Sequence, residues 1–180
     1  METVIDLSGR MGPDRVTTQH LADAVGVTQP AIFRHFSTKA EIWDAVSERI
    51  VSDIEDTMPK EAASQDAIAG SVRGYVSLVE VLPAVPSILH SLELQTEHES
   101  LRQRFRTLDR NRHDKVTKFI EAGQKDDTFH PELPARDVAT IILGWLKSLT
   151  LDWVLADRRF DMADEAERFI ANLDGLIGRS

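Results

Sequence analysis

The fold of this chain is decided by residues 17–36, TTQHLADAVGVTQPAIFRHF, which have the pattern of two short helices joined by a tight turn. Thr17 is a favourable N-cap for a first helix running to about Val25. Gly26 follows, and glycine accepts the left-handed backbone that commonly ends a helix. Thr28 is a second N-cap, and the proline two residues later fits the first turn of a helix without losing a needed donor. The segment therefore predicts a helix-turn-helix unit.

Apolar residues in this segment recur at helical spacing and predict its buried side. We expect the following side chains to face the core of the unit: Leu21, Ala22, Val25, Val27, Ile32 and Phe36. The remaining face of the second helix is polar or small, with Gln29, Ala31, Arg34 and His35. Gln29 has the geometry to pair with adenine in the major groove, Ala31 to meet a thymine methyl, and Arg34 to bind a guanine or, in preference, a phosphate. This face indicates a helix that reads DNA, and hence a gene regulator.

Residues 20–46, HLADAVGVTQPAIFRHFSTKAEIWDAV, resemble the helix-turn-helix signature of the TetR family of bacterial transcriptional regulators. The likeness extends over roughly residues 1–49, with the family's spacing intact. Two departures lie in the expected first helix, where Ser8 replaces a usual phenylalanine and Gly9 a helix former, so we expect that helix to be weaker. The chain also begins inside this helix without the basic arm that often precedes it. We therefore expect either a start further upstream or a smaller contribution from phosphate contacts.

The resemblance implies roles for further residues near the DNA. Phe33 stands where a phosphate-binding tyrosine is common, so only packing against sugar or a base methyl remains there. Lys39 resembles the family's phosphate-contacting lysine in the first turn of the next helix, and His35 is placed to bond a phosphate. Thr18 and Gln19, at the start of the first helix of the motif, add backbone contacts. The predicted DNA-binding residues are Thr18, Gln19, Thr28, Gln29, Pro30, Ala31, Phe33, Arg34, His35 and Lys39.

The composition is ordinary for a soluble globular protein, since 42% of the 180 residues are hydrophobic and 28% are charged, with a formal net charge of -9. The second helix of the motif and the turn beyond it nevertheless carry Arg34 and Lys39 and no acidic residue. This small basic footprint predicts salt-sensitive binding that depends on a dimer. With no cysteine and no signal peptide, we expect a cytoplasmic protein. The longest apolar stretch, near residues 141–155, is interrupted by Lys147 and Asp152 and is too short to cross a membrane, so we expect no membrane partner.

The rest of the chain has helical periodicity and no sustained alternation, so we predict an all-α fold. Thr38 and Glu41 form a capping box at the start of a helix. That helix carries apolar residues at four-residue spacing: Ile42, Val46, Ile50 and Ile54. Further helices are expected over residues 2–11, 67–82, a shorter one ending near 97, 101–122 with Gly123 as its end, 138–155, and from 161 to 178. The expected domains are a three-helix DNA-binding domain, residues 1–48, and a helical effector-binding and dimerisation domain, residues 49–180.

The last two expected helices are apolar on more than one side, which predicts that one side contacts a second copy of the chain. The resemblance implies the same, because in the TetR family these helices commonly form the dimer interface. The predicted interface residues are Trp153, Ala166, Phe169, Ile170, Leu173, Leu176 and Ile177. The pattern alone leaves open the alternative that both sides are buried in the subunit's own core.

The middle helices predict a small-molecule site, because in the TetR family they enclose a cavity whose occupation changes the spacing of the two recognition helices. The candidate lining residues are Tyr75, Leu78, Leu89, Leu92, Phe105, Phe119, Trp145 and Leu149. Most are apolar, so we expect a hydrophobic or aromatic effector and no cofactor. The nearby set His90, Glu93, Glu97 and His98 has no strong metal-binding pattern. No phosphate-binding loop or nucleophile motif is present, so we expect neither a metal site nor an enzyme.

These features predict a homodimeric repressor that leaves a palindromic, double-stranded DNA operator when a small, largely apolar effector binds. Two alternatives remain open. An architectural DNA-binding protein on the same scaffold would have a filled core between the middle helices and no response to a small molecule. A helical ligand-binding protein that does not read DNA would have no specific DNA site.

Overall fold

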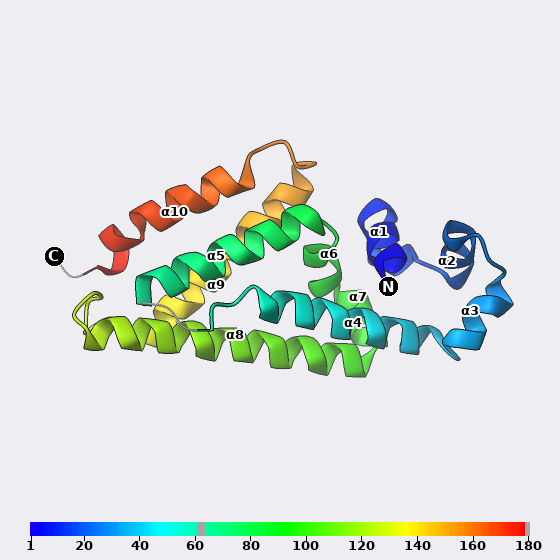
Figure 1. The fold of residues 1–180 in the computed structure, drawn as a ribbon, viewed down its shortest axis with the longest axis horizontal. Helices are drawn as coiled ribbons and strands as arrows, with labels where there is room; N and C mark the ends of the chain where they lie inside the picture. The colour runs from blue at the N-terminus through cyan, green and yellow to red at the C-terminus, as the bar shows by residue number, and fades with distance from the viewer. Residues whose placement is uncertain (61–63, 179–180) are drawn as a thin grey trace. The chain divides into compact units, whose positions relative to one another are not determined.

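The computed structural model describes residues 1–60 and 64–178, and its regular elements are helices. In chain order they are α1 (Glu2–Met11), the 3-10 helix η1 (Pro13–Arg15), α2 (Thr18–Val25), α3 (Gln29–His35), α4 (Lys39–Asp56), α5 (Ser64–Val81), α6 (Val85–Leu89), α7 (Leu92–Glu97), α8 (Glu99–Lys125), α9 (Ala135–Leu155) and α10 (Met162–Ile177) (Figure 1). Within the described ranges, extended pairing is limited to an isolated bridge between Phe129 and Gly178. The predicted all-α class is confirmed.

The chain divides into two compact units. Unit 1 consists of residues 1–53 and 81–108, and unit 2 of residues 54–80 and 109–180. The long helices α4 and α8 each supply residues to both units.

In unit 1, α1 packs against α6 through small residues. Ser8 is buried and its hydroxyl donates a hydrogen bond to the Val4 carbonyl at 2.7 Å. A Cβ atom added at Gly9 would lie 3.3 Å from the Cβ atom of Ala84, the N-cap of α6. Gly9 thus lets α1 approach the start of α6 closely, and Ser8 satisfies its hydroxyl within α1. Helix α1 still extends over the whole predicted range, Glu2–Met11.

The predicted apolar spacing of α4 is confirmed. Its residues Ile42, Val46 and Ile50 are fully buried in unit 1, and Ile54 is fully buried in unit 2. Trp43, only 1% exposed, adds the largest buried side chain on this helix.

Two apolar residues near the turn between α2 and α3 are exposed, contrary to expectation. Leu21 and Ala22 are buried, but Val25 is 54% exposed and Val27 42% exposed. The Val27 backbone N–H bonds the Ala22 carbonyl at 2.9 Å, which closes the turn while the side chain stays at the surface. Ile32 and Phe36 of the second helix are half-buried.

Helix boundaries near Glu97 and Gly123 also differ from the sequence predictions. The single short helix expected to end near Glu97 is split into α6 and α7, because the Ser91 hydroxyl caps a new helix by accepting the Leu94 N–H at 3.1 Å. Gly123 does not end α8, which continues to Lys125. The Gly123 carbonyl instead accepts the N–H groups of Thr128 and Phe129, at 2.8 and 2.9 Å.

In unit 2, α10 is joined to α5 and α9 by polar and aromatic contacts. Arg73 on α5 forms a two-pronged ion pair with Glu167 on α10, with distances of 2.5 and 2.7 Å. The rings of Trp145 on α9 and Phe169 on α10 are stacked, with their centroids 3.8 Å apart. These contacts fix α10 on the helices that precede it.

Helix α9 is longer than its apolar stretch suggested, because it begins at Ala135 and has 21 residues. With a mean hydropathy of 1.5 over its most apolar window, it is long and apolar enough to cross a membrane by length and composition alone, so the expectation that it is too short was wrong. In the structure, 39% of that window is buried. The buried residues follow one stripe: Val138, Ala139, Ile142, Leu146, Leu149, Thr150 and Trp153. This is the pattern of a core helix of unit 2.

Candidate nucleic-acid interface

The turn between α2 and α3 is fixed by its caps. The Thr17 hydroxyl accepts the His20 N–H at 3.1 Å at the start of α2, as the sequence predicted. At the end of α2, Gly26 has the left-handed backbone, with φ 75°, a conformation that costs other residues about 1 kcal/mol or more. The direction in which α3 leaves α2 therefore depends on this glycine.

Helix α3 has no fully buried residue. Pro30 occupies its first turn as predicted, but the Thr28 hydroxyl makes no capping hydrogen bond within the described residues. Phe33 is 43% exposed, and Arg34 and His35 are also exposed. A short helix that buries so little of itself presents most of its surface for contact.

Gln29 is tied to the neighbouring helix. Its side-chain nitrogen donates a 2.7 Å hydrogen bond to the Thr18 hydroxyl on α2, and both residues are half-buried. An amide has two N–H donors and a carbonyl oxygen, so one donor and the oxygen stay free to pair with a base edge. Gln19 is held within α2 by a 2.7 Å bond to Asp23. Thr18 and Gln19 were both predicted to contact DNA from the start of α2. Thr18 also orients Gln29 of α3.

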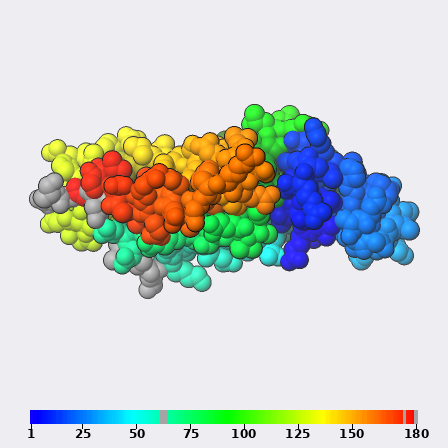
Figure 2. All heavy atoms as spheres, turned by 90° about the horizontal axis from the view of Figure 1, so that it is seen from above, coloured from blue at the N-terminus to red at the C-terminus, as the bar shows by residue number. Residues whose placement is uncertain are grey.

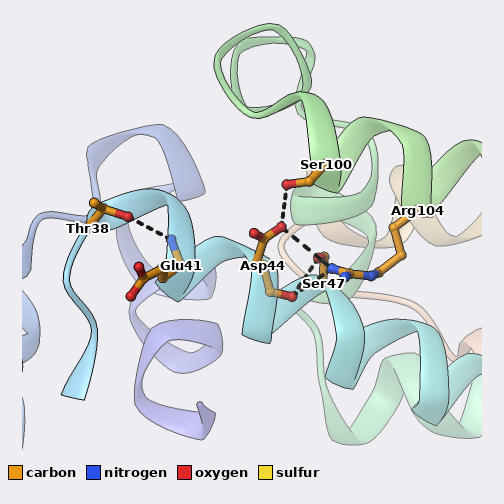
Figure 3. Close-up of polar contacts among 6 residues, drawn as sticks. All are labelled: Thr38, Glu41, Asp44, Ser47, Ser100 and Arg104. Carbon is orange, nitrogen blue, oxygen red and sulfur yellow. Dashed lines mark hydrogen bonds and ion pairs between the residues drawn. The ribbon is translucent and has the colours of Figure 1, made fainter.

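The two cations near α3 have no ion-pair partner among the residues that the structure describes: Arg34 on α3 and Lys39 at the start of α4. The first turn of α4 is closed by the Thr38 hydroxyl, which accepts the Glu41 N–H at 3.2 Å (Figure 3). The Glu41 carboxylate accepts the Ser37 N–H at 2.6 Å. In the usual capping box it would accept the N–H of the N-cap residue, which is Thr38. Lys39 is half-buried within this capped turn.

A polar cluster that the sequence did not predict holds α4 to α8 within unit 1. The Arg104 guanidinium donates to the Asp44 carbonyl at 2.9 Å and to the Ser47 hydroxyl at 2.7 Å, and it lies 3.6 Å from an Asp44 carboxylate oxygen (Figure 3). The Ser100 hydroxyl donates to the same carboxylate. The only sequence signal for this cluster is the position of Asp44 and Ser47 among the buried residues of α4.

His98, at the end of α7, lies beside Trp43 of the same unit, with the ring centroids 6.4 Å apart. Its Nε2 atom is buried and has no hydrogen-bond partner among residues 1–60 and 64–178. Burial lowers the pKa of His98 below its ordinary value of 6.5, against the opposing effect of the Glu97 charge. The described residues contain no group of three or more His, Asp or Glu side chains that could hold a metal ion.

The predicted effector residues are divided between the two units. Leu89, Leu92 and Phe105 belong to unit 1, and Tyr75, Leu78, Phe119, Trp145 and Leu149 to unit 2. Leu92 is 80% exposed in the first turn of α7, so it does not line an enclosed cavity of unit 1. Trp145 and Leu149 line a recess of about 340 Å³ in unit 2, together with Ser148, Asp152, Phe160 and Glu165.

The predicted dimer residues divide by burial. Trp153, Ala166, Leu173 and Ile177 are buried in the core of unit 2, which is the alternative that the sequence left open for them. Phe169 and Ile170 are half-buried, and Leu176 is 62% exposed. Two further apolar residues of α9, Ile141 and Leu155, are 65% and 82% exposed.

Comparison with known proteins places this arrangement among gene regulators. Residues 5–46 match the family described as bacterial regulatory proteins, tetR family, and residues 44–173 match the C-terminal region of YsiA-like proteins. The nucleoid occlusion factor SlmA of Vibrio vulnificus is 23% identical over 175 residues, which are 95% of this chain and 89% of that protein. The HTH-type transcriptional regulator AcrR of Shigella flexneri is 24% identical over a 183-residue alignment, which covers 96% of this chain and 85% of that protein.

The same fold occurs in the transcriptional regulator FadR of Bacillus subtilis, whose structure was solved in complex with stearoyl-CoA. The two chains superpose with a TM-score of 0.73 at 18% identity, over 96% of each. The helix-turn-helix geometry and the two family matches lead to one conclusion: the chain belongs to the TetR family of DNA-binding transcriptional regulators.

Proposed function

We propose that the chain acts in the cytoplasm as a homodimeric repressor that binds a palindromic operator and is released from it by a small, largely apolar effector. The domains predicted from the sequence, residues 1–48 for DNA and 49–180 for effector and dimer, are part of this proposal. The observation that carries it is the α2–α3 pair of unit 1, where an exposed helix with an oriented glutamine lies next to two cations without ion-pair partners among the described residues.

Each part of this surface has a distinct task at the DNA. Gln29, held by Thr18 at 2.7 Å, reads an adenine with its free amide groups. Arg34 and Lys39 bind phosphates, and the free N–H groups at the start of α4 support the second contact. Ala31 and Phe33 contact base methyls or sugars, while Thr28, Pro30, His35 and Gln19 border the same surface. Phosphate contacts fix the protein on the duplex, and the glutamine supplies the sequence preference.

The proposed dimer uses the outer sides of α9 and α10. In the view of Figure 2, α10, coloured orange to red, lies at the surface of unit 2. Its Leu176 is exposed, as are Ile141 and Leu155 of α9, and large exposed apolar side chains on neighbouring helices are typical of an interface. Pairing across a two-fold axis doubles the recognition helix, as a palindromic operator requires.

The effector is supported by the fold and by one relative. FadR of Bacillus subtilis binds stearoyl-CoA, a ligand with a long apolar chain, and its fold covers nearly the whole of this chain. Release requires the effector to bind the DNA-free conformation better than the DNA-bound one, by a coupling free energy of about 1–3 kcal/mol. The similarity to SlmA, a nucleoid occlusion factor, supports a second candidate, an architectural DNA binder whose complex does not respond to small molecules.

The test is in vitro selection of random duplexes with the purified full chain at two salt concentrations, followed by affinity measurements on the selected site. We expect a palindrome with two half-sites. Arg34→Ala and Lys39→Ala should weaken binding to all sequences and lower the salt slope by about one for each phosphate that the variant no longer binds. Gln29→Ala should instead relax the preference at one base step in each half-site.

The matched control is Arg106→Ala, which removes an equal charge from an exposed residue of α8 in unit 1 and should leave the affinity unchanged. Selection without an enriched site would contradict sequence-specific regulation. Equal losses on every sequence for Gln29→Ala would contradict its role in base reading. A palindrome whose complex is not released by apolar acyl compounds would favour the architectural candidate.

A further inference from the structure

A second recess in unit 2 has a basic lining. It has a volume of about 260 Å³ and is lined by Glu55, Met58, Asn111, Arg112 and Lys115. Two of these residues are cations from adjacent turns of α8, and one is a carboxylate from the end of α4. No motif in the sequence predicted a role for this set.

Arg112 is held over a buried aromatic ring. Its guanidinium carbon lies 4.4 Å from the centre of the Tyr75 ring, and Tyr75 is only 2% exposed. Burial raises the pKa of the Tyr75 hydroxyl, although the Arg112 charge and hydrogen bonding with Thr150 and Arg112 act in the opposite direction. The tyrosine therefore remains neutral, and its ring and hydroxyl orient the guanidinium without supplying a counter-charge.

Arg112 forms no ion pair within the described part of the chain, although the Glu55 carboxylate lines the same recess. Its Nε atom is buried and has no hydrogen-bond partner there, although a buried donor is normally paired. Lys115, one turn further along α8 and half-buried, likewise forms no ion pair among the described residues. An unpartnered buried guanidinium N–H beside an open recess is the arrangement that an anionic group would satisfy.

We propose that this recess is an anion-binding site, in which Arg112 and Lys115 bind the acidic head group of an amphipathic small molecule while Met58 contacts its apolar part. The head group is a carboxylate or a phosphate, both of which a guanidinium binds with two parallel hydrogen bonds. The anion site itself does not depend on the proposed function. Only the identification of the bound molecule with the effector rests on that function. It refines the expectation of a largely apolar effector by adding a charged end.

The experiment compares two fluorescent probes of similar shape on the full-length protein without DNA. 8-Anilinonaphthalene-1-sulfonate is an anion, and N-phenyl-1-naphthylamine is its uncharged counterpart. Arg112→Met, which keeps an unbranched apolar stem but no charge, should weaken binding of the anionic probe roughly tenfold or more and change binding of the neutral probe less than about twofold. Lys115→Gln should act in the same direction. Glu55→Gln should strengthen binding of the anion, because it removes the carboxylate from the lining.

The matched control is Lys118→Gln, which removes the same charge from an exposed residue of α8 outside the recess and should leave both probes unaffected. Circular dichroism verifies the fold of each variant, and Lys115→Gln with Glu55→Gln still tests the site if Arg112→Met does not fold. Equal affinity of wild type and variants for the anionic probe, or an equal loss in Lys118→Gln, would overturn the proposal.

Competition distinguishes the head groups and separates this inference from the proposed function. Octanoate and octyl phosphate should displace the anionic probe from the wild type, the better competitor identifying the head group, whereas octanol should not. Displacement by octanol alone would overturn the anion site. If octanoate or octyl phosphate displaces the probe but the protein selects no DNA site, the anion site stands and the repressor function fails.

Discussion

At the scale of single residues, His98 is a titratable group whose charged form the fold opposes. Its side chain is 11% exposed, it lies beside Trp43, and burial lowers its pKa. Lys39 acts in the same direction, while Glu97 and Asp44 oppose it. Between the lowered pKa and the ordinary value of 6.5, the folded protein therefore binds fewer protons at this site than the unfolded chain does.

The free energy of unfolding should consequently fall as the pH decreases from 7.5 to 5.5, by about 1.4 kcal/mol for each unit by which the pKa is lowered. This range lies above the ordinary value of 4.5 for the paired carboxylates Glu99 and Glu167, whose protonation would add a second effect. Urea denaturation at several pH values measures the slope. His98→Gln should flatten it, and His35→Gln, at an exposed histidine of α3, should not. An unchanged slope in His98→Gln would contradict the assignment.

Single residues also show what a sequence can and cannot predict about the site. The exposure of Arg34 and His35 follows from helical spacing around Ile32 and was predicted. The bond between Gln29 and Thr18 joins residues eleven positions apart on different helices, so it depends on the angle between α2 and α3, which no local pattern defines. Val27 was predicted to face the core, because an apolar residue after a helix-ending glycine is often covered by the two helices. This prediction was wrong, since no residue of unit 1 covers the Val27 side chain fully.

At the scale of elements, the start of α4 depends on a single hydroxyl group. Thr38→Ala should lower the free energy of unfolding by about 1 kcal/mol, because the Glu41 N–H loses its acceptor. It should also weaken DNA binding through Lys39, which follows directly in the same turn. Thr38→Ser keeps the acceptor and is the control for urea denaturation and DNA affinity. A loss in Thr38→Ser as large as that in Thr38→Ala would show that the methyl group, and not the cap, is responsible.

Helix boundaries were predictable where a single residue has a strong local preference for a helix end. Gly26 and the Thr17 and Thr38 caps gave the correct limits, because these residues stabilise a helix end independently of distant contacts. Gly123 was misleading, since the chain reverses further on, at Asp127, which takes the left-handed φ of 63°. The Arg104 contact with Asp44 spans 60 positions, and only the packing of α8 on α4 creates it.

At the scale of the whole molecule, the assembly of two chains is the main expectation. Leu176→Asp and Ile141→Asp should convert the proposed dimer to a monomer, because each places a charge in an apolar interface. Val81→Asp is the matched control, since Val81 is 76% exposed on α5, away from these helices in the sequence. Light scattering coupled to size-exclusion chromatography gives the mass. A wild type that is monomeric at micromolar concentration, or variants that remain dimeric, would contradict an interface on α9 and α10.

The attachment of α10 within unit 2 bears on how such a dimer forms. The ion pair between Arg73 and Glu167 holds the middle of the helix, and the His130 N–H bonds the Ile177 carbonyl at 2.8 Å at its end. The surface that would meet a second copy is thus already ordered in one chain. In the proposed dimer, association freezes few additional rotamers and little backbone. The two chains of that dimer meet as preformed bodies, and the contacts between them are not offset by a large loss of conformational entropy.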